Sequence, residues 1–283
     1  MAESTLSVAK ADLDKAIAVE LGMDPSAPVT GANGQMIDRI RKSGERSFYY
    51  ALAGDQQGLV EWSFANPPAT LSLVAGTGDY DLPDNFAYVG SIGPRLVYAV
   101  GTSFVSAEKV DSHSLLEARA RESGSTLTAT IASGDLSLGV ASVRNFPVLA
   151  TPFTVQIDTE FLRVTAVSGT TFTVSRAYNG TTAAGHTSGA LVTLLGPPKR
   201  FAVRPKAGTP TAGAGQRFEL LTFPTTDAAR TINYRYSIQP NAVTDAAPYP
   251  LGGAQHGETL MLACLARAEL FIKREPGPLT AEF

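Results

Sequence analysis

Side chains that could perform acid–base chemistry are few in this chain and far apart in the sequence. The three histidines, His113, His186 and His256, lie in different segments, so a histidine-based triad has few ways to assemble. We expect His186 to cap a strand from a turn and His256 to lie near a helix start. The pair Asp158 and Glu160 has the residue type that glycoside hydrolysis requires, and its spacing predicts that both carboxylates share one strand face. An enzyme acting on glycans or peptidoglycan is therefore one hypothesis.

Two further groups of residues have a functional and a structural interpretation. A carboxylate cluster would suit calcium, but it lacks the glycine and the terminal glutamate of an EF-hand loop, which favours a polar hairpin. An aromatic set would suit sugar stacking, but aromatic residues beside a strand are more often core or interface. The cluster is Asp79, Asp81 and Asp84, and the aromatic set is Trp62, Phe64 and Tyr80. No phosphate-binding loop, serine elbow or zinc-protease motif occurs, so the sequence predicts no enzyme, metal or cofactor.

The densest basic stretch has no acidic residue within it. One hypothesis is that this stretch lines a channel and contacts DNA phosphates, which is a sequence-independent and salt-sensitive interaction. The alternative, which we favour, is a solvated loop or a strip of inter-subunit salt bridges. The residues are Lys199, Arg200, Arg204, Lys206 and Arg217.

The composition is that of a soluble globular protein. The 283 residues are 44% hydrophobic and 17% charged, and the net charge of -3 indicates no global attraction to nucleic acid or to an anionic membrane. Cys264 is the only cysteine, so no disulfide within the chain is possible. We find no export signal and no apolar run long enough to span a membrane, and we expect synthesis in a reducing cytoplasm.

The elements that must position these residues are mainly short strands. Residues 153–195 alternate apolar and polar positions, as in Phe172 and Val174, and turn residues such as Gly169 and Asn179-Gly180 punctuate them. Ser123-Gly124-Ser125 and Gly196-Pro197-Pro198 flank this region, which indicates an inserted β-domain. Outside it, residues 69–74 and 80–83 predict a hairpin with its second strand at an edge. Further strands are expected over residues 89–92, 97–100, 201–203, 218–223 and 231–238.

Helices are expected near both ends and once in the middle. Apolar spacing predicts helices over residues 7–23, from residue 33 to the region of Gly54, over 112–121 and over 256–273. The last helix is apolar around much of its circumference, so it must pack against other helices or another subunit. Its candidate interface residues are Leu260, Leu262, Leu265, Leu270 and Ile272.

These patterns predict an α+β fold with three domains. A helical bundle is expected from residues 1–58 and 254–283, and a host β-sheet domain from 59–124 and 197–253. A small all-β domain, barrel-like or sandwich-like, is expected over residues 125–196 as an insertion in the host.

Several short motifs lie in the segments that flank the inserted β-domain. They are Phe48-Tyr49-Tyr50, Glu61-Trp62-Ser63-Phe64, the run from Thr70 to Pro83, the run from Glu219 to Pro224, and the run from Tyr249 to Gly253. In this order they resemble head-to-tail adaptor (connector) proteins of tailed bacteriophages, and the similarity covers roughly residues 8–110 and 199–275. The segment from Thr126 to Leu195 is similar to a β-domain that recurs in phage structural proteins. The matching segments are residues 157–160, 164–167 and 179–182.

The resemblance implies a structural virion protein at the interface of head and tail. Adaptors of this family assemble as a dodecameric ring around the DNA channel, with a helical bundle on the portal ring. The implied partners are the portal protein, a tail terminator or tail-tube protein, other copies of the chain, and double-stranded DNA through non-specific proximity; no membrane is implied. The alternative is a binding module of the virion surface or tail, in which the inserted β-domain recognises a glycan or a neighbouring structural protein.

Overall fold

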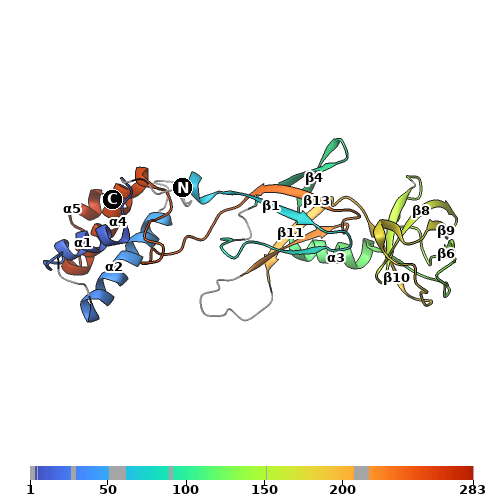
Figure 1. The fold of residues 1–283 in the computed structure, drawn as a ribbon, viewed down its shortest axis with the longest axis horizontal. Coiled ribbons are helices and arrows are strands. Elements are labelled where there is room, and N and C mark those ends of the chain that lie inside the picture. The colour runs from blue at the N-terminus through green and yellow to red at the C-terminus, as the bar shows by residue number, and fades with distance from the viewer. Residues whose placement is uncertain are drawn as a thin grey trace. The chain divides into compact units, whose positions relative to one another are not determined.

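The computed structural model describes residues 4, 6–26, 30–50, 62–88, 92–150, 152–206 and 217–282. The chain divides into two compact units. Met1–Pro67 and Ile238–Phe283 form the first, which we name the helical unit, and Pro68–Ser237 form the second, which we name the β unit. Figure 1 shows the elements of both units.

The helical unit joins the two ends of the chain around one apolar core. The core includes Leu13, Ile17, Ile40, Phe48 and Leu260, each at most 3% exposed. These residues recur at helical spacing, so each helix presents one apolar face to the others. The helices are α1 (Lys10–Glu20), α2 (Gly31–Tyr49), α4 (Gly257–Lys273) and α5 (Pro278–Glu282), with short 3-10 turns at Ser63–Ala65 and Ala254–His256.

The β unit contains a seven-stranded sheet that curls into a half-barrel. In spatial order its strands are β1 (Pro68–Leu73), β13 (Arg230–Arg235), β3 (Arg95–Val100), β4 (Ser103–Lys109), β11 (Arg200–Pro205), β12 (Phe218–Phe223) and β2 (Asp79–Asp81). Neighbours are antiparallel except for β4 and β11. Helix α3 (Ser112–Glu122) buries Leu115 and Ala118 against Ala202 and Leu221 of this sheet. The side chain of Asp111 caps this helix by accepting a hydrogen bond from the Ser114 amide at 2.8 Å.

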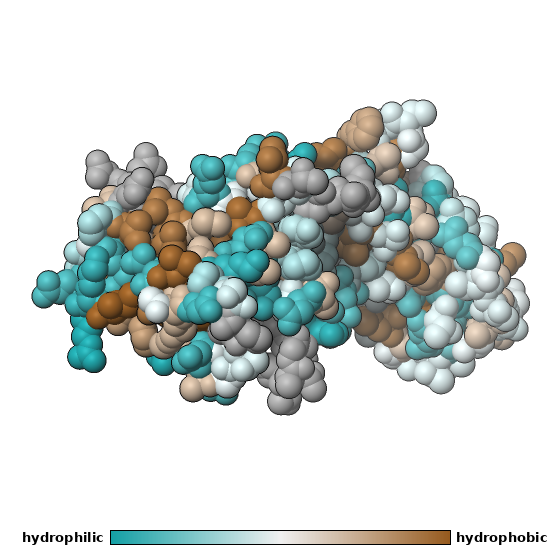
Figure 2. Space-filling view, turned by 60° about the vertical axis from the view of Figure 1, so that its left-hand side comes forward, coloured by the Kyte–Doolittle hydropathy of each residue, from teal (hydrophilic) through white to brown (hydrophobic). Residues whose placement is uncertain are grey.

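The second sheet of the β unit has six strands and curls into a nearly closed barrel. In spatial order they are β5 (Gly124–Thr126), β10 (Leu191–Leu195), β7 (Phe153–Ile157), β8 (Glu160–Ser168), β9 (Thr171–Ser175) and β6 (Ser137–Gly139). A bridge between Leu127 and Val140 joins the two ends of the sheet. Alternate residues such as Phe172 and Val174 face inward, and the many threonines and serines outside give this surface its pale colour in Figure 2.

The predicted fold class is wrong. The molecule is mostly β, with two curled sheets and about 29% helix, and it is not an α+β arrangement of a helical bundle, a host sheet and a small inserted domain. Helices α1, α2 and α4 do form near the chain ends, but they make up a minor part of the molecule. Strand pairing over long sequence distances leaves little local signal, so the curvature and extent of both sheets were missed.

Most individual elements lie where the sequence predicts them, but the predicted hairpin of residues 69–83 does not form. Strand β1 pairs with β13 and β2 pairs with β12, so the two strands occupy opposite edges of the seven-stranded sheet. The prediction that the second strand is an edge strand is confirmed. Most of the predicted strand at 89–92, the predicted helix end near Gly54, and Glu61 lie outside the described residues.

Candidate functional site

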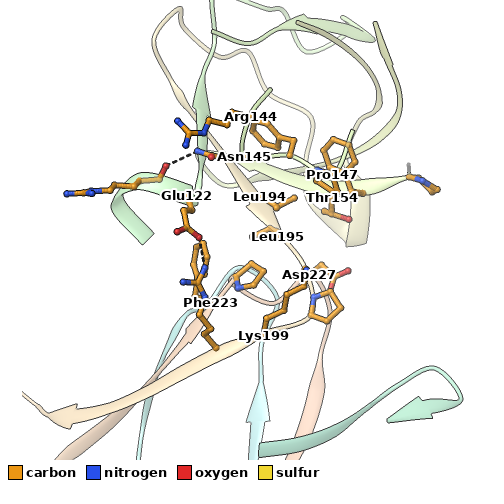
Figure 3. A pocket seen from close by; sticks show the side chains of 18 of the residues that line it. Glu122, Arg144, Asn145, Pro147, Thr154, Leu194, Leu195, Lys199, Phe223 and Asp227 are labelled. Carbon is orange, nitrogen blue, oxygen red and sulfur yellow. Dashed lines mark hydrogen bonds and ion pairs between the residues drawn. The ribbon is translucent and has the colours of Figure 1, made fainter. Parts of the chain in front are cut away.

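A cleft of about 1150 Å³ opens where the barrel meets the half-barrel within the β unit. Figure 3 shows its walls: the end of α3, the barrel loop with Arg144, Asn145 and Pro147, the end of β10, and the half-barrel residues Lys199 and Phe223. The cleft therefore combines segments from residue 121 to residue 227. Its volume slightly exceeds that of ordinary small-molecule pockets.

Specific hydrogen bonds fix the barrel on the half-barrel beside the cleft. The backbone amide of Gly196 donates to the Thr225 carbonyl at 2.9 Å, and the side-chain amide of Asn179 donates to the Asp227 carbonyl at 2.6 Å. Asn179 adopts a φ of 53°, a conformation that asparagine tolerates and that its Asn-Gly pair predicts. On the other wall, Asn145 donates to the Arg121 carbonyl at 2.8 Å. These contacts link the barrel wall of the cleft to the half-barrel wall.

The cleft is cationic, with five basic and two acidic side chains lining it. Arg200 lies 5.0 Å from the ring centre of Phe223 and forms an ion pair with Glu122. Arg163 donates to the Thr154 hydroxyl at 2.9 Å. These two guanidinium groups are held in defined positions, which lowers the entropic cost of using them to bind a ligand.

Three of the cations in the cleft, Arg144, Arg163 and Lys199, carry no ion pair within the described part of the chain. Arg144, on the barrel loop, and Lys199, just before β11, are both exposed. Figure 3 shows them on opposite walls, with Leu194 and Leu195 between them. The site is thus a two-walled cleft with a partly apolar floor and cationic sides.

The structure distributes the five predicted basic residues over two places. Lys199 and Arg200 line the cleft. Arg204, Lys206 and Arg217 lie on or beside the paired strands β11 and β12. They form ion pairs with Glu219, Asp81 and Asp84, respectively.

The predicted carboxylate cluster of residues 79–84 is likewise divided among separate cations. Asp79 pairs with Arg119 at 2.6 Å, while the other two carboxylates bind Lys206 and Arg217. Across the described segments, no group of histidine, cysteine, aspartate or glutamate side chains is arranged to hold a metal ion. Of the predicted aromatic set, Trp62 and Phe64 stack on each other in the helical unit, and Tyr80 belongs to the β unit.

His186 joins the two carboxylates that the sequence suggested as a catalytic pair. Its Nδ1 lies 2.7 Å from Asp158 and its Nε2 lies 2.9 Å from Glu160. The expectation that both carboxylates share a strand face is wrong, because Asp158 lies in the β7–β8 turn with a φ of 51° and Glu160 begins β8. The imidazole is buried, and only Asp158 is open to solvent.

Arg176 completes this network and was not anticipated from the sequence. It donates to both oxygens of Glu160, at 2.8 and 2.7 Å, and the amides of Ala177 and Ala184 add two more hydrogen bonds. Burial raises the pKa of Glu160, but the hydrogen bonds from Arg176 and these amides outweigh it and lower the pKa to about 2. A fully buried carboxylate requires such a partner. The network joins the β7–β8 turn to the end of β9 and to the segment before β10.

The five candidate interface residues of α4 differ in exposure. Leu260 is buried in the core, while Leu262, Leu265 and Leu270 are partly buried. Ile272 is 47% exposed beside Phe271, which is 49% exposed. On the face drawn in Figure 2, apolar side chains gather over the helices at the left. The end of α4 is therefore the part of this predicted surface that is open to a partner.

No described helix has the length and apolar character needed to cross a membrane. No known protein-family model matches the chain, and no curated protein matches it with significant similarity.

Proposed function

We propose that this chain is a structural virion protein, a head-to-tail adaptor whose copies form a ring between the portal and the tail of a bacteriophage. One observation supports the proposal most strongly. The motifs that carry the resemblance are scattered from residue 48 to residue 253, yet they pack against one another in two clusters. A resemblance to one family of folded proteins would bring its motifs together in this way.

The first cluster lies in the helical unit. The ring of Phe48 stacks on Trp62 at a centroid distance of 4.9 Å, and Trp62 stacks on Phe64 at 5.5 Å. The Leu251 amide donates to the Tyr49 hydroxyl at 3.0 Å. A Cβ at Gly252 would lie 3.1 Å from the Phe64 ring, so glycine permits this approach. Three of the resembling motifs therefore form one aromatic cluster.

The second cluster lies in the seven-stranded sheet. Strand β2, from the motif Thr70–Pro83, pairs with β12, from the motif Glu219–Pro224, so that Tyr80 lies opposite Leu220. The Thr222 amide also donates to the Gly78 carbonyl at 2.9 Å. The two motifs, far apart in the sequence, are adjacent strands of one structural element.

An adaptor of this kind acts through contact area and symmetry. A closed ring requires two different complementary faces on each copy. The exposed end of α4 with Phe271 and Ile272 is our candidate face for the portal, and the edges of the half-barrel are candidates for contacts between copies. Tail terminator or tail-tube protein would bind on the opposite side of the ring, and double-stranded DNA would pass through its centre.

Mass measurement and a portal-binding assay test the proposal. We expect the isolated chain to be monomeric or weakly associated and to form rings only with purified portal rings. The double variant Phe271→Ser/Ile272→Ser should lose portal binding. The control Leu136→Ser, which changes a 60% exposed barrel residue, should retain it. A tight dimer in solution, or particles that contain no ring of this chain by electron microscopy, would refute the adaptor proposal.

A further inference from the structure

We infer that the cleft between barrel and half-barrel is a docking site for an extended, acidic segment of another protein chain. This inference goes beyond the proposed function and does not depend on it. It follows from the charge, the apolar lining and the shape of the cleft.

The charge of the cleft is opposite to that of the molecule. The whole chain has a net charge of -3, whereas five basic side chains and two acidic ones line the cleft. Asp227, one of the two acids, is paired with Arg230 outside the cleft, and Glu122 is paired with Arg200. Arg144, Arg163 and Lys199 remain without an ion pair among the described residues, and Arg144 and Lys199 face the same space from opposite walls. Such a site attracts an anion.

Glu122 shows that this space accepts a carboxylate. Its side chain binds the guanidinium of Arg200, whose position over Phe223 is fixed by a cation–π contact at 5.0 Å. Carboxylates of a docked segment would bind Arg144 and Lys199 in the same manner. Arg163, which donates to the Thr154 hydroxyl, is a further cation in the lining of the cleft.

The apolar lining favours a peptide over a nucleic acid. Leu194, Leu195, Pro147, Pro197 and Phe223 contribute to the walls between the cations. Apolar side chains of a peptide would bury this surface, whereas a sugar–phosphate backbone would use only the charges. The concave, two-walled shape also fits a single extended chain better than the convex cylinder of a DNA duplex. An acidic segment that contains apolar residues therefore matches the cleft in both respects.

Fluorescence anisotropy with defined peptides tests the inference on the full chain. The probes are labelled ten-residue peptides in which the numbers of Glu and Leu residues vary independently. We expect peptides rich in both to bind at least tenfold more tightly than analogues with Gln in place of Glu. The double variant Arg144→Glu/Lys199→Glu should weaken this binding at least tenfold. The control Lys15→Glu/Arg39→Glu makes the same charge change on exposed residues of the helical unit and should have no effect.

Three results would overturn the inference. The first is equal binding of the Glu and Gln peptides, and the second is an equal loss of binding in both double variants, which would indicate non-specific attraction. The third is tighter binding of a 20-base-pair DNA duplex that the cleft variant abolishes, which would assign the site to nucleic acid. If the charge reversal impairs folding, judged by circular dichroism, Arg144→Gln/Lys199→Gln replaces it with the same comparison.

Discussion

At the scale of single residues, the best-defined polar feature is the buried network of Asp158, Glu160, Arg176 and His186. Glu160 is fully buried and accepts hydrogen bonds from a guanidinium and two backbone amides. Each ring nitrogen of His186 faces a carboxylate oxygen. An ionised carboxylate has no proton to donate, so it can only accept a hydrogen bond. The side chains that sequence reasoning proposed for catalysis thus join three segments of the barrel.

Because of this network, the free energy of unfolding of the barrel should fall at acidic pH. The pKa of Glu160 is about 2 in the folded chain against an ordinary value of 4.5. The carboxylate therefore stabilises the fold fully above pH 4.5, and this contribution is lost as the pH falls toward 2. The shift corresponds to about 3 kcal/mol. We expect urea unfolding of the barrel, followed by pulsed hydrogen exchange in β7 and β8, to show this loss.

The variant Glu160→Gln distinguishes the loss of stability caused by protonation of Glu160 from the loss caused by other carboxylates. It leaves the Arg176 guanidinium buried without its charged partner, and breaking a buried pair costs about 3–5 kcal/mol at neutral pH. Its stability should then no longer fall between pH 4.5 and pH 2 to the same extent. The control Glu117→Gln, on the exposed side of α3, should retain the acid dependence of the natural chain. An unchanged pH profile in Glu160→Gln would show that other groups cause it.

At the scale of elements, local sequence patterns predicted individual helices and strands but not their partners. The spacing of Leu260, Ala263 and Leu270 predicts α4. The alternation of Phe172 and Val174 predicts β9. The partner of Leu71 in β1 is Ile232, in a strand near the end of the sheet-forming sequence, and nothing local to residues 69–83 indicates this pairing. A hairpin was the simplest local solution, and it was wrong.

The cleft was beyond prediction for the same physical reason. The sequence marked Lys199 and Arg200 as part of a basic stretch, and these residues do line the cleft. Their neighbours Arg144 and Glu122 come from other elements, and only the folded chain brings them together. For the buried network, the sequence did contain one signal. A buried carboxylate such as Glu160 requires a cation, and Arg176 directly follows the strand β9 that pairs with β8.

The contact between α2 and α4 supplies a prediction at this scale. A Cβ at Gly44 would lie 2.5 Å from Cα and 2.6 Å from Sγ of Cys264, so the two helices approach where no side chain fits. We expect Gly44→Ala to destabilise the helical unit by about 1–3 kcal/mol through overpacking, despite the better helix propensity of alanine. Fluorescence of Trp62, the only tryptophan, reports this unfolding because its ring stacks on Phe48.

The neighbouring residue Ser43 provides the matched control for this helix contact. Ser43 is exposed on α2, so Ser43→Ala should change the midpoint of urea unfolding little. If Gly44→Ala were as stable as the natural chain, α2 and α4 would have to adjust without cost, and the close approach would not be required for the fold.

At the scale of the whole molecule, the chain passes from the half-barrel into the barrel and back again through adjacent strands. Strand β5 pairs with β10, so that Thr126 lies opposite Leu191. The half-barrel consists of strands that precede β5 or follow β10, and its sheet order contains no barrel strand. The aromatic cluster and the β2–β12 pair, which support the proposed adaptor function, involve no barrel residue. The barrel therefore is separable in principle from the part that we assign to ring formation.

Excision of the barrel tests this separation. Replacing residues 127–190 by Asn-Gly joins two residues that already pair, and this dipeptide favours a tight hairpin turn. We expect the shortened chain to fold, with an unchanged Trp62 unfolding transition, and to bind portal rings as the full chain does. The acidic peptides should no longer bind, because Arg144 and Arg163 are removed with the barrel wall of the cleft. Loss of portal binding in a folded, shortened chain would instead assign portal binding to the barrel.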